Sequence, residues 1–224
     1  MPPRINQLWP LFDLRIRSER LVLRLPSDDE LADLAALARA GIHPPDEMPF
    51  AVPWSTLPSP EFETGFAQHH WLMRASWKPD GWGLNLAVEL EGRLVGSQSI
   101  HAESFRVLRK VDTGSWLGEA FQRRGLGTEM RAAILAFAFD GLGAEVALTE
   151  ATLDNAGSNG VSRSLGYEQN GFGRLAPGGV VRDTIRYRMT RAGWMARPRP
   201  AIGIEGLERC AALFGIAGDD TGTA

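Results

Sequence analysis

The chain has 224 residues, of which 44% are hydrophobic and 23% are charged. This composition is typical of a globular protein with one large core and excludes collagen-like, coiled-coil and wholly disordered chains. The charged residues, 24 Lys and Arg against 27 Asp and Glu, leave a net charge of −3, far from the basic surface of a nucleic-acid-binding protein. The sequence has no run of about 18 apolar residues to span a bilayer. We therefore expect neither nucleic acid nor a membrane as a partner.

The single cysteine, Cys210, excludes an internal disulfide and favours a reducing compartment. The N-terminus lacks the apolar stretch and cleavage site of a signal peptide, so we expect a cytoplasmic protein. His43, His69 and His70 have no cysteine at a ligand spacing, so no metal site is predicted.

In the first quarter of the chain, the pattern predicts a strand, a helix and a long loop. Residues 21–25 alternate in hydrophobicity, as a half-buried strand does. Ser27 and Glu30 have the spacing of a capping box, and apolar residues then recur at helical intervals up to Gly41. Six prolines over residues 44–60 remove too many backbone donors for a helix or a central strand, so we expect an extended loop there.

The rest of the chain alternates between strand and helix patterns. The expected elements are a helix over 61–75, a hairpin of strands 84–90 and 94–100 around Glu91-Gly92, a strand over 111–117, a helix over 130–139, a strand over 146–153, a helix from 157 to 166, strands over 167–172 and 181–189, and a helix over 205–214. Arg131 is the only polar residue of the stretch 130–139, so that helix should be buried almost all round. The order predicts one α+β domain over residues 1–194 and a C-terminal extension over 195–224 that frays from residue 218.

The most informative segment is residues 122–128, at the junction of a strand and a helix. Gly125 and Gly127 leave several backbone N–H groups at the helix start unpaired and unshielded, and the helix dipole adds positive charge. Arg123 and Arg124 add full charges, so the segment has the groups to hold a pyrophosphate. The alternative is a tight surface turn with solvated arginines, because short glycine motifs recur by chance.

The motifs around this segment resemble one family. Gln122-Arg123-Arg124-Gly125-Leu126-Gly127 fits the Q/R-x-x-G-x-G/A signature of the GNAT superfamily of acyl-CoA-dependent N-acyltransferases. Residues 154–167 are similar to the N-x-x-S-x-x-V…LGF stretch of the Rim-type ribosomal-protein N-acetyltransferases, and residues 112–117 to their E-I-G-Y-W-L strand. The flanks at residues 9–15, 48–54 and 213–215 further resemble a GNAT branch described as succinyltransferases.

The resemblance implies the GNAT fold, a mixed, mostly antiparallel sheet of about seven strands flanked by helices. It implies acetyl-CoA or succinyl-CoA as acyl donor, no metal, and direct attack of an amine on the thioester in a ternary complex. The acceptor would be a protein N-terminus, a lysine or a small amine. The residues implied in cofactor binding are Leu117, Gly118, Gln122, Arg123, Arg124, Gly125, Leu126, Gly127, Thr128, Asn155 and Ser158.

The same resemblance implies catalytic roles. A backbone N–H at Leu117 or Gly118 would polarise the thioester carbonyl, and Ser158 aligns with the serine that hydrogen-bonds near the sulfur. The alternative for Ser158 and its neighbour Asn155 is helix capping, which both residue types favour. The tyrosine acid of many GNAT enzymes is absent. As general base we consider Asp112 and His101; the alternative for His101 is a surface residue at a strand end.

Several questions stay open in the sequence. A succinyl donor needs a cation at the acyl end, and the candidates Arg74, Lys78, Arg106 and Arg109 are not distinguished. The proline-rich loop is expected to wall the acceptor pocket. Two other functions are considered: a catalytically silent acyl-CoA sensor, and a scaffold or homodimer module that docks through the residues after Trp194.

Overall fold

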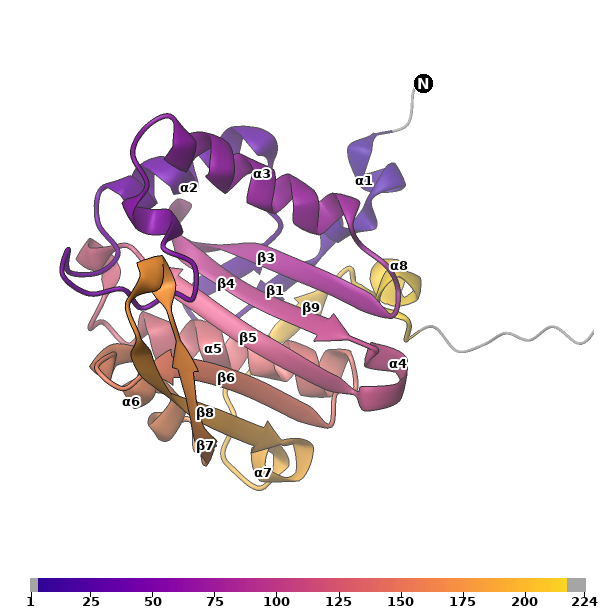
Figure 1. Cartoon of the computed structure of the whole chain (residues 1–224). Coiled ribbons are helices and arrows are strands. Elements are labelled where there is room, and N and C mark those ends of the chain that lie inside the picture. Colours follow the sequence, from indigo (N-terminus) through magenta and orange to yellow (C-terminus); the bar gives the residue numbers. More distant parts are fainter. Residues whose placement is uncertain (1–3, 217–224) are drawn as a thin grey trace, which may run out of the picture.

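A nine-stranded sheet runs through the computed structural model, which describes residues 4–216 (Figure 1). Its strands are β1 (Arg15–Arg17), β2 (Leu21–Arg24), β3 (Gly81–Leu90), β4 (Arg93–Glu103), β5 (Lys110–Leu117), β6 (Val146–Thr152), β7 (Glu168–Leu175), β8 (Arg182–Thr190) and β9 (Gly203–Glu205). They lie in the order β7-β8-β6-β5-β4-β3-β2-β1-β9, and within the described residues only β5 and β6 pair in parallel. The α+β class with a mostly antiparallel sheet is confirmed, with nine strands instead of about seven.

Helices cover both faces of the sheet. They are α1 (Ile5–Leu8), α2 (Asp28–Arg39), α3 (Glu61–Ala75), α4 (Phe105–Leu108), α5 (Leu126–Ala136), α6 (Ala156–Ser164), α7 (Arg191–Met195) and α8 (Leu207–Cys210). Helices α2 and α3 lie on one face and α5 and α6 on the other (Figure 1). Each face therefore has its own apolar cluster, and the larger cluster lies between the sheet and α5.

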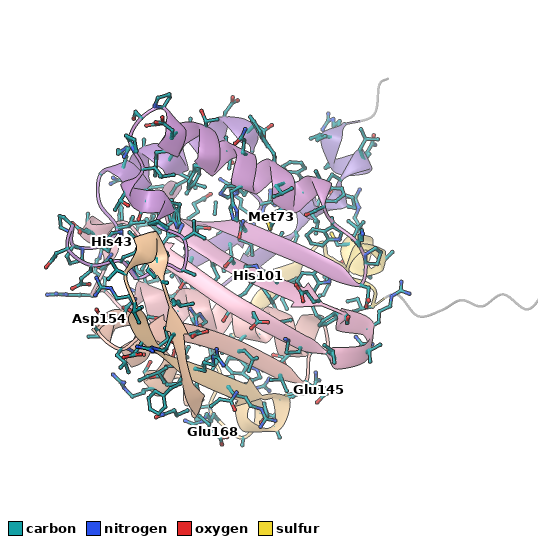
Figure 2. The ribbon with its side chains drawn as sticks, in the orientation of Figure 1. His43, Met73, His101, Glu145, Asp154 and Glu168 are labelled. Atoms are coloured by element: carbon teal, nitrogen blue, oxygen red, sulfur yellow. The ribbon has the colours of Figure 1, made fainter. Side chains whose placement is uncertain are left out.

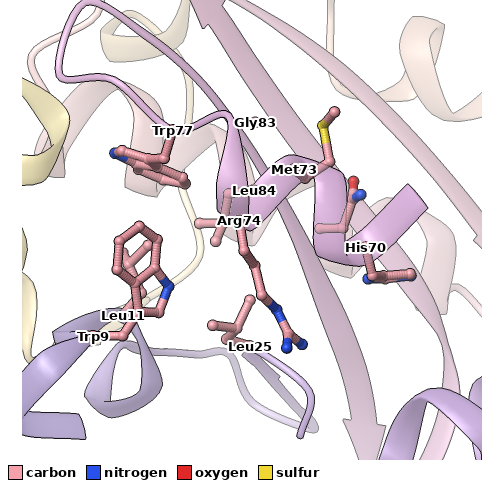
Figure 3. A pocket seen from close by; sticks show the side chains of 10 residues that line it. Trp9, Leu11, Leu25, His70, Met73, Arg74, Trp77, Gly83 and Leu84 are labelled. Carbon is pink, nitrogen blue, oxygen red and sulfur yellow. The ribbon is translucent and has the colours of Figure 1, made fainter. Parts of the chain in front are cut away.

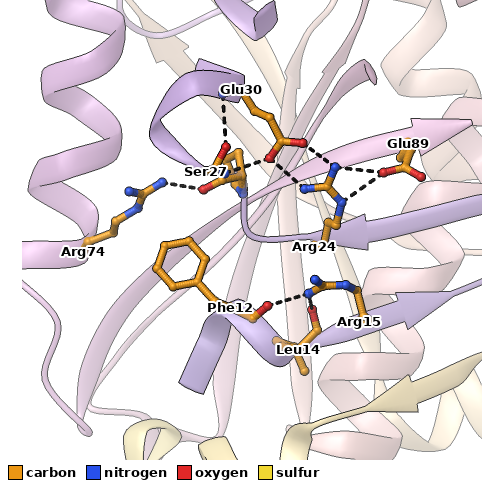
Figure 4. Close-up of polar contacts among 9 residues, drawn as sticks. Phe12, Leu14, Arg15, Arg24, Ser27, Glu30, Arg74 and Glu89 are labelled. Carbon is orange, nitrogen blue, oxygen red and sulfur yellow. Dashed lines mark hydrogen bonds and ion pairs between the residues drawn. The ribbon is translucent and has the colours of Figure 1, made fainter. Parts of the chain in front are cut away.

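Helix α2 begins where its sequence signal predicts. The hydroxyl of Ser27 accepts a hydrogen bond from the Glu30 N–H at 3.3 Å, and the Glu30 carboxylate accepts one from the Ser27 N–H at 2.8 Å. Arg24, on the preceding strand, forms ion pairs of 2.5 Å with Glu30 and 2.9 Å with Glu89 (Figure 4). The hydrogen bond from Arg24 lowers the pKa of Glu30 to about 2, so this carboxylate stays charged and ties β2, β3 and α2 together.

Two short strands and the C-terminal segment differ from the prediction. Strands β1 and β9 have three residues each, too few to show an alternating pattern, and they pair with each other. The helix expected over 205–214 is broken, because Glu205 ends β9 and α8 begins only after Gly206. Gly206 has a φ of 77°, and a Cβ built there would lie 2.6 Å from the carbonyl oxygen of Asp13, so the turn requires glycine.

The segment after residue 194 contributes to the same sheet and core. Phe214 is fully buried, and its ring packs edge-on against Trp77, Trp82 and Phe137 at centroid distances of 4.9 to 5.6 Å. The boundary at residue 194 remains a prediction, and residues 203–216 pack as part of one core with the chain before it. The fraying expected from residue 218 falls outside the described residues.

Candidate active site

Strands β5 and β6 separate after the first three residues of each. Their pairing covers only Lys110–Asp112 against Val146–Leu148. Beyond this point β5 continues beside β4 as far as Leu117, while β6 continues beside β8 as far as Thr152. We call the gap between residues 113–117 and 149–152 the fork. Its facing edges carry backbone groups without a strand partner, which can pair with an extended ligand.

The antiparallel ladder decides which amides of β5 face the fork. The N–H of Gly118 donates to the carbonyl oxygen of Val95 at 3.0 Å, so this amide points toward β4. Because amide direction alternates along a strand, the N–H of Trp116 also faces β4, and those of Ser115 and Leu117 face the fork. Of the two amides considered from the sequence, Leu117 is therefore directed into the gap and Gly118 away from it.

A row of unpaired amides lies where β5 leads into α5. Within residues 4–216, the backbone N–H groups of residues 123–128 have no hydrogen-bond partner, and the first bond of the helix runs from Glu129 N–H to the carbonyl of Gly125 at 3.1 Å. Gly125 occupies the N-cap position with a φ of 77° and no side-chain cap. Helix start, open amides and the exposed side chains of Arg123 and Arg124 together form a site for an anion.

Two side chains hold this loop in place. The amide nitrogen of Gln122 donates to the carbonyl oxygens of Leu117 and Ile42, both at 2.9 Å. On the other side, Arg20 pairs with Glu129 at 2.6 Å and donates to the carbonyl oxygen of Arg124 at 3.3 Å. Gln122 therefore positions the loop through its side chain, a role different from direct contact with a ligand.

Helix α6 borders the same end of the fork. A Cβ built on Gly127 would lie 3.5 Å from Val161, which places the start of α5 against α6. Asn155 accepts a hydrogen bond from the Ser158 N–H at 2.9 Å, so it caps α6. The hydroxyl of Ser158 has no hydrogen-bond partner in the described part of the chain and is half-buried. The capping role thus belongs to the Asn155 side chain and leaves the Ser158 hydroxyl free for a ligand.

The candidate bases lie on the opposite face of the sheet, at the closed end of the fork. His101 is directly across from Asp112 in the β4–β5 ladder, on the side of the sheet that carries α3 (Figure 2). Desolvation lowers the pKa of His101, while the carboxylate of Asp112 raises it. The only ion-pair partner of Asp112 in the described residues is Lys110, at 3.7 Å. His101 is exposed, as the alternative reading of this residue expected, and its lowered pKa favours the neutral imidazole, which can accept a proton.

Sequence reasoning did not assign a role to two charged residues of the fork. Glu150 lies on β6 inside the fork, accepts a hydrogen bond from the Thr184 hydroxyl and pairs with Arg186 at 3.5 Å. Arg131 extends from α5 to the two strands of the fork, where it contacts Ser115 and Thr149. Its side chain is buried, with only 2% exposed. In the sequence, Glu150 and Arg131 are each the only charged residue of an otherwise uncharged strand or helix stretch. This pattern was the one signal that could have indicated them.

The proline-rich loop lies beside the open end of the fork. The ring of Trp54 packs 6.1 Å from that of Trp116 on β5. Arg182, at the start of β8, pairs with Asp154 at 3.0 Å and donates to the carbonyl oxygen of Asp46 at 3.5 Å, so it connects this loop to the end of β6. The loop therefore borders the open end of the fork, and its role as a wall of the acceptor pocket stays a prediction.

A separate narrow pocket lies between α3, β3 and the N-terminal segment (Figure 3). Its lining includes Trp9, Arg74 and the buried ring of His70, and strand β4 separates it from β5. Burial lowers the pKa of His70 to about 3, so the ring is uncharged at neutral pH. This pocket lies away from the fork and is not part of the candidate site.

A model of the acetyltransferase (GNAT) domain matches residues 20–168, more than half of the chain. The chain belongs to the GNAT acetyltransferase family. The fork and the loop of residues 122–128 both fall within the matched GNAT domain, whereas α8 and β9 lie beyond it.

Solved structures share this GNAT fold. RimJ from Mycobacterium smegmatis, in complex with CoA-disulfide, is 19% identical with a TM-score of 0.64, over 89% of this chain and 92% of that one. RimL, the ribosomal L7/L12 alpha-N-protein acetyltransferase, in complex with coenzyme A, is 19% identical with a TM-score of 0.62, over 79% and 97%. A GNAT-family acetyltransferase from Bacillus anthracis is 16% identical with a TM-score of 0.64, over 80% and 99%. At sequence identities below 20%, the structural similarity establishes that the fold is shared.

Among the described residues of this GNAT chain, no three His, Cys, Asp or Glu side chains gather as metal ligands. No helix within residues 4–216 combines the length and the apolar character that a membrane span requires.

Proposed function

We propose that this GNAT chain is an N-acyltransferase that moves an acyl group from acyl-CoA to a primary amine in a ternary complex. The observation that carries the proposal is the run of unpaired amides over residues 123–128 at the open end of the fork. These amides and the arginines beside them would hold the pyrophosphate of coenzyme A. The pantetheine arm would then extend along the fork and pair with the free edge of β5.

The amides of Leu117 and Ser115 are the donors that this arrangement offers to the thioester carbonyl. Both N–H groups are directed into the fork by the β4–β5 register. A backbone N–H beside the carbonyl stabilises the negative charge that develops on its oxygen when the amine attacks. We therefore propose that the N–H of Leu117 polarises the thioester carbonyl, as the family resemblance implies, and that the N–H of Ser115 takes part in the same interaction.

Ser158 and the His101–Asp112 pair would carry out the two proton transfers of the reaction. The Ser158 hydroxyl, free of partners at the start of α6, is placed to protonate the departing thiolate. The neutral imidazole of His101 would accept the proton of the amine, directly or through water, and Asp112 opposite it would stabilise the imidazolium. Asn155 and residues 123–128 complete the proposed cofactor site, and Gln122 positions the loop that carries them.

Membership of the GNAT acetyltransferase family supports acetyl-CoA as an acyl donor. The name of RimL, which specifies an alpha-N-protein acetyltransferase, supports a protein N-terminal amine as acceptor, ahead of a lysine or a small amine. We further propose that the reaction takes place in the cytoplasm, where acyl-CoA is present and where a single buried cysteine stays reduced.

A thermal unfolding scan with coenzyme A tests the proposal. Ligand at about 100 times its dissociation constant should stabilise the protein by roughly 2.7 kcal/mol. In the variant Gly125→Glu, the added carboxylate would occupy the loop and repel the pyrophosphate, so we expect the stabilisation to disappear. Gly92→Glu is the matched control, because Gly92 has a similar φ of 76° and open space around it in the β3–β4 turn.

Three outcomes are informative. If Gly92→Glu keeps the coenzyme A shift and Gly125→Glu loses it, the loop of residues 122–128 is the cofactor site. Binding without turnover across a panel of amines would favour the acyl-CoA sensor. An absence of any shift in the wild-type protein would contradict the proposal and favour the scaffold.

A further inference from the structure

The parallel ladder between β5 and β6 ends at the pair of Asp112 and Leu148. If the ladder continued by one step, the carbonyl oxygen of Thr113 would accept a hydrogen bond from the N–H of Glu150. This carbonyl accepts instead from the hydroxyl of Thr149, at 3.0 Å. A side chain of β6 therefore occupies the acceptor that the next backbone amide of β6 would use.

Arg131 on α5 fixes the direction of that hydroxyl. Its Nη1 atom donates to Oγ1 of Thr149 at 3.0 Å, so the hydroxyl accepts from the arginine and directs its own hydrogen to Thr113. The Nη2 atom donates to the hydroxyl oxygen of Ser115 on β5, also at 3.0 Å. One rigid, planar group thus contacts both strands at a level where they do not pair with each other.

A second threonine completes these contacts at the closed end of the fork. The hydroxyl of Thr113 donates to the carbonyl oxygen of Leu148 at 3.2 Å, and Leu148 is the last residue of β6 in the ladder. Thr113 and Thr149 therefore each donate from their side chain to the backbone of the other strand. We call Thr113, Arg131 and Thr149 the apex network.

The apex network is buried, although it carries a charge. Arg131 is 2% exposed and each threonine is 6% exposed. Within residues 4–216, no carboxylate lies within ion-pair distance of Arg131, and its Nε atom has no hydrogen-bond partner. Burial of an unpaired charge is unfavourable for folding, and the neighbouring residues of α5 show that apolar side chains pack well there. What the arginine adds is a pair of directed hydrogen bonds to two separate strands.

Without the apex network, the two edges of the fork have groups that can pair with each other. The amides of Ser115 and Leu117 face the fork from β5. On the other edge, the N–H of Leu153 donates to a carbonyl oxygen of β8 at 2.9 Å, so by alternation the amides of Glu150 and Thr152 face the fork. Continued pairing of these edges would close the gap.

We propose that Arg131 is a positioning residue that, through Thr149, ends the β5–β6 ladder and keeps the fork open for the pantetheine arm of acyl-CoA. The inference rests on the proposed function, in which that arm pairs with the free edge of β5. Arg131 itself does not contact the ligand, in agreement with its burial beneath the strands. It acts through the hydroxyls of Ser115 and Thr149, which hold the two edges apart.

Hydrogen exchange of the ligand-free protein, followed by NMR, tests the network without any ligand. In the wild type, the amides of Ser115 and Leu117 have no strand partner and should exchange quickly. Thr149→Val removes the hydroxyl at nearly constant volume, so β5 and β6 should pair further and exchange at both amides should slow at least about tenfold. A loss of stability alone accelerates exchange. Unchanged or faster exchange at these amides would therefore overturn the inference.

A titration then compares coenzyme A with 3′-phospho-ADP, its nucleotide half, which has the pyrophosphate and lacks the pantetheine arm. The wild type should bind coenzyme A about 10-fold more tightly, the range of one or two additional backbone hydrogen bonds. In Arg131→Met this ratio should fall below about twofold, while affinity for 3′-phospho-ADP stays within about twofold, because the loop of residues 122–128 is untouched. The same titration on Thr149→Val covers the case in which Arg131→Met does not fold.

Gln98→Met is the matched control, because Gln98 is buried beside the same strands and its amide nitrogen donates only to the carbonyl oxygens of Ser99 and Gly114, on β4 and β5. This variant should keep the wild-type exchange rates and the wild-type ratio. A retained ratio in Arg131→Met, or equal weakening of both ligands, would mean that Arg131 contributes only to packing, and the inference would be wrong. If the wild type binds neither ligand, the proposed function is contradicted, and the exchange rates still decide whether the network holds the fork open.

Discussion

Asp112 on β5 lies directly opposite His101 on β4, and Asp112 is also the last residue of β5 that pairs with β6. The two side chains therefore stand at the point where the sheet begins to separate, on the face that carries α3. A base at this position is close to the end of the fork where the acyl group would lie. The carboxylate of Asp112 raises the pKa of His101, whereas desolvation lowers it. The role of the pair can therefore be tested through the pH dependence of activity.

In Asp112→Asn the acidic limb of the pH profile of kcat/KM should move to lower pH. Asp112 raises the pKa of His101, so removal of the carboxylate lets desolvation lower that pKa further. A base works only when deprotonated, so activity then persists to more acidic pH, although kcat falls because the imidazolium loses its stabilising charge. If activity instead falls about 100-fold with an unmoved limb, Asp112 itself would be the base. Asp183→Asn, at an exposed ion pair on β8, is the control.

Ser158→Ala should lower kcat roughly 10- to 100-fold and leave the affinity for coenzyme A nearly unchanged. The cap of α6 runs from the backbone N–H of Ser158 to Asn155, so the alanine variant keeps this hydrogen bond and the helix. Ser164→Ala, on the exposed side of the same helix, should have wild-type kinetics. An unaltered kcat in Ser158→Ala would remove this hydroxyl from the mechanism.

The stability of the protein should decrease between pH 6.5 and pH 3 through His70. The pKa of His70 is lowered to about 3 by burial, with smaller contributions from His69 and Arg74. The unfolded chain takes up a proton below about pH 6.5 while the folded ring does not, so stability is present above that pH and is lost on acidification. At pH 5 the loss amounts to about 2 kcal/mol for this single group. Urea unfolding at pH 7 and pH 5 measures it.

His70→Gln should reduce that pH dependence, because glutamine does not titrate. His69, whose pKa is also lowered by desolvation, will leave part of the slope in place. A variant that loses as much stability between pH 7 and pH 5 as the wild type would show that His70 is not the responsible group.

Phe214→Ala should destabilise the protein by about 3 to 5 kcal/mol, the usual cost of an aromatic truncation in a packed core. Phe214 is fully buried against three aromatic rings, which come from the connection between α3 and β3, from β3 itself and from the turn after α5. Phe172→Ala, which truncates a ring that is 63% exposed, should change stability by less than about 0.5 kcal/mol. Equal midpoints in denaturant for the two variants would mean that residues 203–216 form a separate extension.

Local signals predicted the elements that depend on neighbouring residues. The capping box of Ser27 and Glu30 and the turn at Glu91-Gly92 are set by side-chain and backbone preferences within a few residues, and both are confirmed. Strand β9 was missed because its only strand partner, β1, is 186 or more residues away in the chain, and β1 was missed because three residues are too few to show an alternating pattern.

The candidate site shows the same division. The amides of residues 123–128 follow from a glycine motif at a helix start, so the sequence could indicate them. The direction of the Gly118 amide depends on the ladder with β4, and the position of Arg131 depends on where two strands part. Neither relation has a local signature, and an arginine in an apolar stretch is equally compatible with a helix that turns one polar residue to solvent.

The pairing of β1 with β9 has a consequence for the order of assembly. Arg15–Arg17 is synthesised before the other eight strands, whereas its partner Gly203–Glu205 and the ring of Phe214 are synthesised after all of them. Until that late segment emerges, Trp77 and Trp82 lack the aromatic ring that closes over them. A nascent chain stalled at residue 200 would therefore expose a tryptophan-rich surface, which makes it a substrate for chaperones rather than a finished enzyme.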